Sequence, residues 1–166
     1  EVPHRYAIVM AFAMDYDQIK RVPNKTNQEW LRVYNDGSKT AVDLAEYIRG
    51  LGYPARAHTL YKEDLAMIPH AYAAGLGELG KHGSLINNTL GPCFRLAVVT
   101  TDLPLVEDSP KIEGVDDFCT NCQVCVNYCP GDAISHNKQS VRGVYKWVVD
   151  TVACAPYWAS YEACGI

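Results

Sequence analysis

The chain has 166 residues, of which 48% are hydrophobic and 20% charged, and this balance allows a packed core and argues against intrinsic disorder. The net charge of −4 argues against a nucleic-acid-binding protein, whose phosphate contacts need a basic face. The longest apolar run, residues 6–14, is too short to cross a bilayer, and no signal peptide is visible in the sequence.

The predicted elements of the first half begin with residues 5–14, a continuous apolar run that predicts a fully buried strand. Residues 20–37 are polar and carry an Asn-Asp-Gly turn signal at 35–37, so we expect a loop there. A helix is then predicted to begin after Ser38 as N-cap and to stop at Gly50. Further along, we expect a strand over 55–60, a helix over 70–74, a strand over 94–101, a linker over 107–117 and a strand-like run over 144–149.

The seven cysteines are unevenly placed, because Cys93 stands alone and the other six lie between residues 119 and 164. A disulfide-stapled secreted domain would spread its cysteines through the whole core. The clustering therefore predicts a metal module over 116–166, appended to a cysteine-poor domain over 1–115.

The metal module opens with C-x2-C-x2-C-x3-C-P, the spacing of a bacterial iron–sulfur ferredoxin. This spacing predicts that three thiolates ligate one [4Fe–4S] cube while the fourth serves a second cluster. The four cysteines of this run are Cys119, Cys122, Cys125 and Cys129. A zinc site is the alternative, but zinc favours paired knuckles separated by a longer loop.

A second cluster would need further ligands, and Cys154 and Cys164 are the only cysteines that follow Cys129. Each of the two clusters would then lack one thiolate, so we expect a fragment whose continuation carries more cysteines. The alternative is one intact cluster and two cysteines that bind no metal.

The sequence resembles one family, the corrinoid-dependent reductive dehalogenases. The most specific segment is Ala-Gly-Leu-Gly-Glu-Leu-Gly-Lys-His-Gly-Ser-Leu at 74–85, which lacks the spacing of a dinucleotide-binding turn. The other matching segments are 9–16, 44–55, 68–69, 91–96 and 101–105, with the ferredoxin run at the expected distance. The resemblance thus spans nearly the whole chain.

The resemblance implies an α/β fold, a nitroreductase-like sandwich around base-off cobalamin, followed by a ferredoxin-like module with two [4Fe–4S] clusters. It implies reductive dehalogenation of an organohalide by cobalamin that is reduced through these clusters. It also implies a respiratory electron donor, a small membrane-anchor protein as partner and export to the outer face of the cytoplasmic membrane. The family's N-terminal domain and twin-arginine signal are missing, so both ends are expected to be cut.

Three catalytic residues follow from the resemblance. Tyr34 matches the family's proton donor, Arg95 its arginine, and Lys62 a position where many members have asparagine. A phenol suits proton donation to a carbanion-like carbon when cations stabilise the phenolate. The alternatives are that Tyr34 only packs its ring and that Lys62 is a solvated surface residue. Cys93 departs from the family pattern and is expected to act as a small buried apolar side chain.

The segment 74–85 is also expected to contact the corrin, because a flat ring needs a close approach of backbone that only glycine allows. The candidate cofactor-binding residues are Gly75, Gly77, Glu78, Gly80, His82, Gly83 and Leu85. The alternatives are ordinary turn glycines and, for His82, a surface position.

Two other functions compete with dehalogenation. Epoxyqueuosine reductase shares the corrinoid and both clusters but acts on a tRNA base, and it should show a more basic surface and a GLGW-type turn where this chain has Glu78. The other is a ferredoxin-type electron-transfer protein without catalysis. Bound corrinoid would distinguish an enzyme from the latter.

Overall fold

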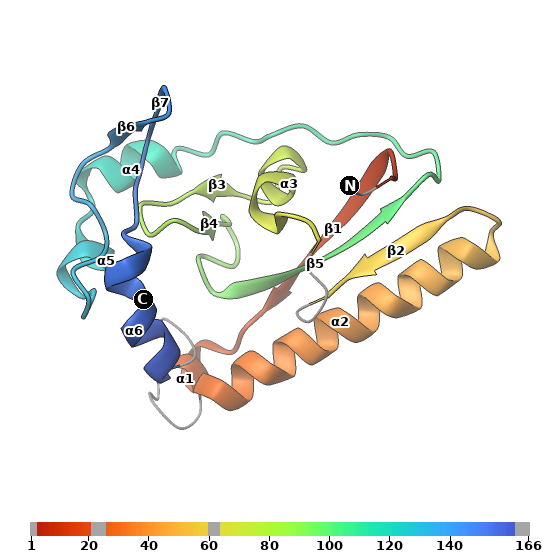
Figure 1. The fold of residues 1–166 in the computed structure, drawn as a ribbon, viewed down its shortest axis with the longest axis horizontal. Coiled ribbons are helices and arrows are strands. Elements are labelled where there is room, and N and C mark those ends of the chain that lie inside the picture. Colours follow the sequence, from red (N-terminus) through yellow and green to blue (C-terminus); the bar gives the residue numbers. More distant parts are fainter. Residues whose placement is uncertain (1–2, 21–25, 60–63, 162–166) are drawn as a thin grey trace.

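The structure is a computed structural model, and it describes residues 3–20, 26–59 and 64–161. Its centre is a three-stranded antiparallel sheet in the order β1 (Tyr6–Ala13), β5 (Phe94–Thr101), β2 (Ala55–His58). Long helix α2 runs along this sheet, while the cysteine-bearing helices lie at one end of the molecule (Figure 1). The expected mixed α/β fold is confirmed.

Strand β1 differs from the sequence prediction, because it is half-buried along most of its length instead of fully buried. The central strand is β5, which spans the predicted residues 94–101 and is buried over most of them. Within the described part of the chain, β1 is an edge strand, and its residues 6–9 line an open hollow of about 520 Å³. The apolar side chains of β1 therefore pack against both cores only in part, while its backbone pairs with β5.

Helix α2 (Thr26–Gly50) contradicts the loop predicted over 20–37, since 26–37 are helical and Ser38 lies within the helix. Residues 21–25 lie outside the described residues. The turn signal fails because Gly37 faces the sheet, where a Cβ would lie only 3.3 Å from the Phe12 ring. Gly37 thus allows close packing, and the buried positions Val33, Ala41, Ala45 and Ile48 continue the same helical stripe on either side of it. The predicted end at Gly50 is confirmed.

The opposite face of the sheet carries a second core made by Ala71, Leu85 and Phe94. Ala71 belongs to α3 (Met67–Ala73), which begins three residues earlier than predicted. Leu85 belongs to the hairpin of β3 (Glu78–Leu79) and β4 (Leu85–Ile86). This hairpin, here called the β3–β4 hairpin and defined as residues 75–86, is the glycine-rich segment that the sequence singled out.

An extended stretch after β5 leads to the cysteine-rich part, as Figure 1 shows. That part contains α4 (Val115–Asn121), α5 (Val124–Asn127), β6 (Gln139–Val141), β7 (Val144–Lys146) and α6 (Thr151–Tyr161). The predicted linker over 107–117 is extended only as far as 114, and the predicted strand over 144–149 is shorter. In the described part of the chain, no helix is long and apolar enough to span a membrane.

Candidate functional site

Two of the three predicted catalytic residues lie together on one side of the sheet. Arg95 sits on β5 opposite Phe12 of β1, and its Cζ lies 5.7 Å from the centroid of the Tyr34 ring on α2. The Trp30 ring, one helical turn earlier, packs edge-on against Tyr34 with centroids 5.0 Å apart. Tyr34 and Arg95 thus lie close together, and their catalytic roles stay predictions. Lys62 lies outside the described residues.

The Arg95 guanidinium is incompletely paired. Its Nη1 donates to the Phe94 carbonyl at 3.3 Å, while its Nε is buried and has no hydrogen-bond partner among the described residues. A buried N–H group without an acceptor is unfavourable, so native structures seldom keep one without a function. The Arg95 Nε–H is therefore available to donate a hydrogen bond to an anion, such as a phenolate or a negatively charged ligand.

Cys93 lies just before Arg95, and its thiol is half-buried, in partial agreement with the expected buried side chain. Burial raises the pKa of the Cys93 thiol, and the Arg95 charge lowers it. Cys93 also lines a hollow of about 680 Å³ that is walled by Leu90, by Val124 of α5 and by Tyr128, which follows α5. This hollow therefore lies between the sheet and the cysteine-rich part.

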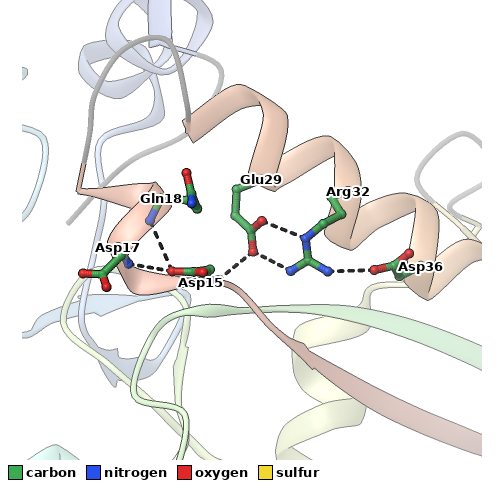
Figure 2. Close-up of polar contacts among 6 residues, drawn as sticks. All are labelled: Asp15, Asp17, Gln18, Glu29, Arg32 and Asp36. Atoms are coloured by element: carbon green, nitrogen blue, oxygen red, sulfur yellow. Dashed lines mark hydrogen bonds and ion pairs between the residues drawn. The ribbon is translucent and has the colours of Figure 1, made fainter.

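A buried carboxylate anchors the beginning of α2 to the end of β1 (Figure 2). Glu29 is 5% exposed, and its Oε1 accepts from the Asp15 N–H at 2.6 Å and from Arg32 Nη2 at 2.6 Å. Arg32 Nε donates to Glu29 Oε2 at 2.8 Å, and Arg32 also pairs with Asp36 at 2.8 Å. The hydrogen bonds from Arg32 lower the pKa of Glu29, against the opposing effect of burial.

This network ties down the helix over Glu29, Arg32 and Asp36, the segment that also contains the candidate proton donor Tyr34. Asp15 contacts both helices. Its N–H donates to Glu29 of α2, and its Oδ1 accepts from the N–H groups of Asp17 and Gln18 and so caps α1 (Tyr16–Ile19). Sequence reasoning missed Glu29. The available signal was the helical spacing of charges from Glu29 to Arg32 and Asp36, which lay inside the supposed loop.

The glycines of the β3–β4 hairpin have a structural role within the chain itself. A Cβ on Gly77 would lie 2.5 Å from the Ile86 carbonyl oxygen, and one on Gly75 would lie 2.6 Å from the Ser109 carbonyl oxygen. Added Cβ atoms on Gly80 and Gly83 would meet the His82 ring and the Val149 side chain. These contacts favour the turn-glycine alternative, and corrin contact by these residues stays a prediction.

The other candidates in this hairpin also bind within the chain. Leu85 belongs to the core, and burial lowers the pKa of His82, which accepts from the Ser84 N–H at 3.3 Å. Glu78 is buried, and its Oε1 accepts from the backbone N–H groups of Glu113 and Val115 at the start of α4. The structure thus connects Glu78 to the helix that carries Cys119.

The first three cysteines of the ferredoxin run gather at the junction of α4 and α5. Burial raises the pKa of the Cys125 thiol, nearby Cys119 and Cys122 raise it further, and the Lys81 ammonium lowers it. All three are free thiols, so the donor set fits an iron–sulfur cluster. Over the described ranges, no three His, Cys, Asp or Glu side chains are arranged to hold a single metal ion.

Cys129 makes a different contact from the other three cysteines of the run, since its Sγ accepts a hydrogen bond from the Ala133 N–H at 3.4 Å. The chain after it packs onto α6, where a Cβ on Gly131 would lie 2.7 Å from the Ala153 carbonyl oxygen. Ala153 precedes Cys154, so the Cys129 and Cys154 segments adjoin. Their shared ligation of a second cluster stays a prediction, and Cys164 lies outside the described residues.

Comparison with known proteins adds three findings. The family described as "4Fe-4S binding domain" matches residues 114–135. A tetrachloroethene reductive dehalogenase of Desulfitobacterium hafniense is 34% identical over 165 residues, which cover 92% of this chain and 30% of that protein. A solved reductive dehalogenase, whose structure "suggests a mechanism for B12-dependent dehalogenation", is 32% identical with a TM-score of 0.88, covering 93% of this chain and 23% of its own.

A weaker match is the epoxyqueuosine reductase of Aliivibrio fischeri, which is 35% identical over 125 residues, or 75% of this chain and 29% of that protein. The chain spans about a third of the length of the curated relatives that it matches.

Proposed function

Since the chain belongs to the reductive dehalogenase family, we propose that it forms part of an enzyme that replaces the halogen of an organohalide by hydrogen. The overall reaction is R–X + 2 e⁻ + H⁺ → R–H + X⁻. The observation that carries the proposal is the Arg95 guanidinium, which lies over the Tyr34 ring and whose buried Nε has no hydrogen-bond partner in the part of the chain that the structure describes.

In this proposal Tyr34 gives the proton to the carbon that loses the halide, and Arg95 stabilises the phenolate that remains. Arg95 suits this role because its charge is permanent and its position on the central sheet is fixed. The Glu29 network holds the helix that carries Tyr34. The resemblance to the family adds Lys62 as a further candidate catalytic residue. A simple electron carrier would have no use for this pair.

Two kinds of cofactor belong to the proposal. When bound, cobalamin supplies the reduction of the carbon–halogen bond, and two [4Fe–4S] clusters supply single electrons. Cys119, Cys122 and Cys125 would ligate one cluster, and their grouping and free thiols support this. Cys129, Cys154 and Cys164 would ligate the other. For cobalamin the support is the similarity to reductive dehalogenases, one of which is a B12-dependent enzyme of known structure.

The test is Tyr34→Phe in the full-length enzyme, with Tyr47→Phe as the matched control. Tyr47 lies on the same helix but is 66% exposed, so its hydroxyl should not matter. We expect Tyr34→Phe to keep its cofactor content and to lose roughly 10²–10⁴ in turnover, the range of a positioned acid. Dehalogenation by Tyr34→Phe at the rate of the control would remove Tyr34 from the mechanism.

Epoxyqueuosine reduction is the second candidate, because its similarity reaches 75% of the chain. The chain's net charge of −4 is unfavourable for a tRNA substrate. Assaying the same holoenzyme with an organohalide and with epoxyqueuosine-containing tRNA decides between the two. Turnover of the tRNA alone would overturn the dehalogenase proposal. The proposed respiratory electron donor, membrane-anchor partner and export rest on family membership only.

A further inference from the structure

Lys81, in the turn of the β3–β4 hairpin, is a buried lysine, with 1% of its surface exposed. Its Nζ donates to the Cys122 carbonyl at 3.0 Å and to the His136 carbonyl at 3.2 Å. The same Nζ lies 4.6 Å from the centroid of the Trp147 ring. An ammonium has three N–H donors, and these three neighbours can occupy all of them. Each neighbour is electrically neutral.

A buried cation with only neutral partners is unfavourable unless a counter-charge lies nearby. Among the residues that the structure describes, no carboxylate forms an ion pair with Lys81. The ammonium instead lies beside the cysteine run, because its Nζ donates to the carbonyl of Cys122, one of the three grouped cysteines. Thiolates around a [4Fe–4S] core carry a net negative charge, and reduction adds one more electron to it.

We infer that Lys81 is the internal counter-charge of the cluster that Cys119, Cys122 and Cys125 ligate, and that it raises the reduction potential of this cluster. The inference rests on the proposed function in one respect, namely that a [4Fe–4S] cluster occupies these cysteines. Net charge around a cluster is one of the factors that set its potential. A fixed cation favours the reduced state, since that state carries more negative charge.

The β3–β4 hairpin binds α4, the helix that carries Cys119, at both of its ends. Glu78 accepts from the Val115 N–H at 3.2 Å at the beginning of this helix, and Lys81 binds the carbonyl of Cys122, the residue that ends it. Negative charge at the first turn and positive charge at the last both match the helix dipole. Glu78 thus attaches the hairpin to α4, whereas Lys81 also places a positive charge beside the cysteine run.

The test compares Lys81→Met, Lys81→Arg and Lys138→Met in the anaerobically purified holoenzyme. Lys138 is the matched control, since its Nζ lies 5.2 Å from the same Trp147 ring but pairs with Asp116. The readouts are iron and sulfide content and the midpoint potential of the cluster signal, titrated by electron paramagnetic resonance. Lys81→Met should lower the equilibrium constant for reduction by about tenfold, equivalent to about 59 mV for one electron. Lys81→Arg and Lys138→Met should stay close to the wild-type potential.

Lys81→Met with wild-type iron content and an unchanged potential would overturn the inference and leave the proposed function intact. If Lys81→Met fails to keep the cluster, iron content in Lys81→Arg and Lys81→Gln decides instead. Retention in Lys81→Arg with loss in Lys81→Gln supports a charge requirement, and equal loss in both refutes it. A wild-type enzyme without any [4Fe–4S] signal would refute the cluster assignment and this inference together.

Discussion

Removing the Glu29 carboxylate tests whether the network at the start of α2 holds the fold together. In Glu29→Ala, the Asp15 N–H loses its acceptor and Arg32 loses both of its hydrogen bonds to Glu29. Hydrogen bonds to charged groups contribute about 1.5–3 kcal/mol, and Glu29 is buried enough for this range to apply. Arg32 is 52% exposed and regains water, so we take a total of about 2 kcal/mol.

For a protein of this size, about 2 kcal/mol corresponds to a decrease in Tm of roughly 4–8 °C. Thermal unfolding followed by circular dichroism measures it. Asp36→Ala is the control, because Asp36 is 57% exposed and its surface pair with Arg32 should contribute less than about 0.5 kcal/mol. Equal Tm values for Glu29→Ala and Asp36→Ala would refute the reasoning.

The same network predicts a pH dependence. The pKa of Glu29 is lowered in the folded state, mainly by the hydrogen bonds from Arg32, so its carboxylate stabilises the fold fully above the ordinary value of 4.5. This stabilisation is lost as the pH falls through the lowered value. Glu29→Gln should therefore differ most from wild type at neutral pH and converge with it in acid. A constant difference at every pH would contradict this origin.

Two more substitutions test the hairpin and Cys93. Gly77→Ala places a Cβ 2.5 Å from the Ile86 carbonyl oxygen. We expect the free energy of unfolding, measured with denaturant, to fall by about 1–3 kcal/mol. Wild-type stability would show that the backbone can move to make room for the Cβ. Cys93→Ala should keep the full iron content of the holoenzyme, because the C-x2-C-x2-C-x3-C spacing of the ligands does not include Cys93. Loss of iron would identify Cys93 as a ligand.

The sequence predicted those elements whose signal is local. Strand β5 was placed at both of its ends, because its sequence is rich in β-branched residues, which favour strands. The beginning of α2 was missed because the Asn-Asp-Gly signal describes an isolated turn, whereas the close approach of Phe12 to Gly37 is a tertiary contact. Strand β1 was predicted as buried since apolar content alone does not say whether a strand lies at an edge.

The candidate site was predictable to the extent that residue spacing or family resemblance determines it. Cysteine spacing predicts the cluster ligands, and the resemblance singled out Tyr34 and Arg95, which the structure brings close together. The roles of Glu29 and Lys81 were not predictable, since both residue types are rarely buried and nothing in the sequence marks these two as exceptions. Their burial depends on partners distant in the chain, such as Trp147 for Lys81.

The β3–β4 hairpin thereby gains a function that does not depend on whether it touches a corrin. Its glycines let the chain turn tightly on itself, and its two buried charges attach it to both ends of α4. Electron transfer between two cofactors requires a fixed separation, and a hairpin packed on the core through Leu85 provides a rigid base for it. In the proposed enzyme, one short segment would therefore position the cluster and also, through the charge of Lys81, favour its reduced state.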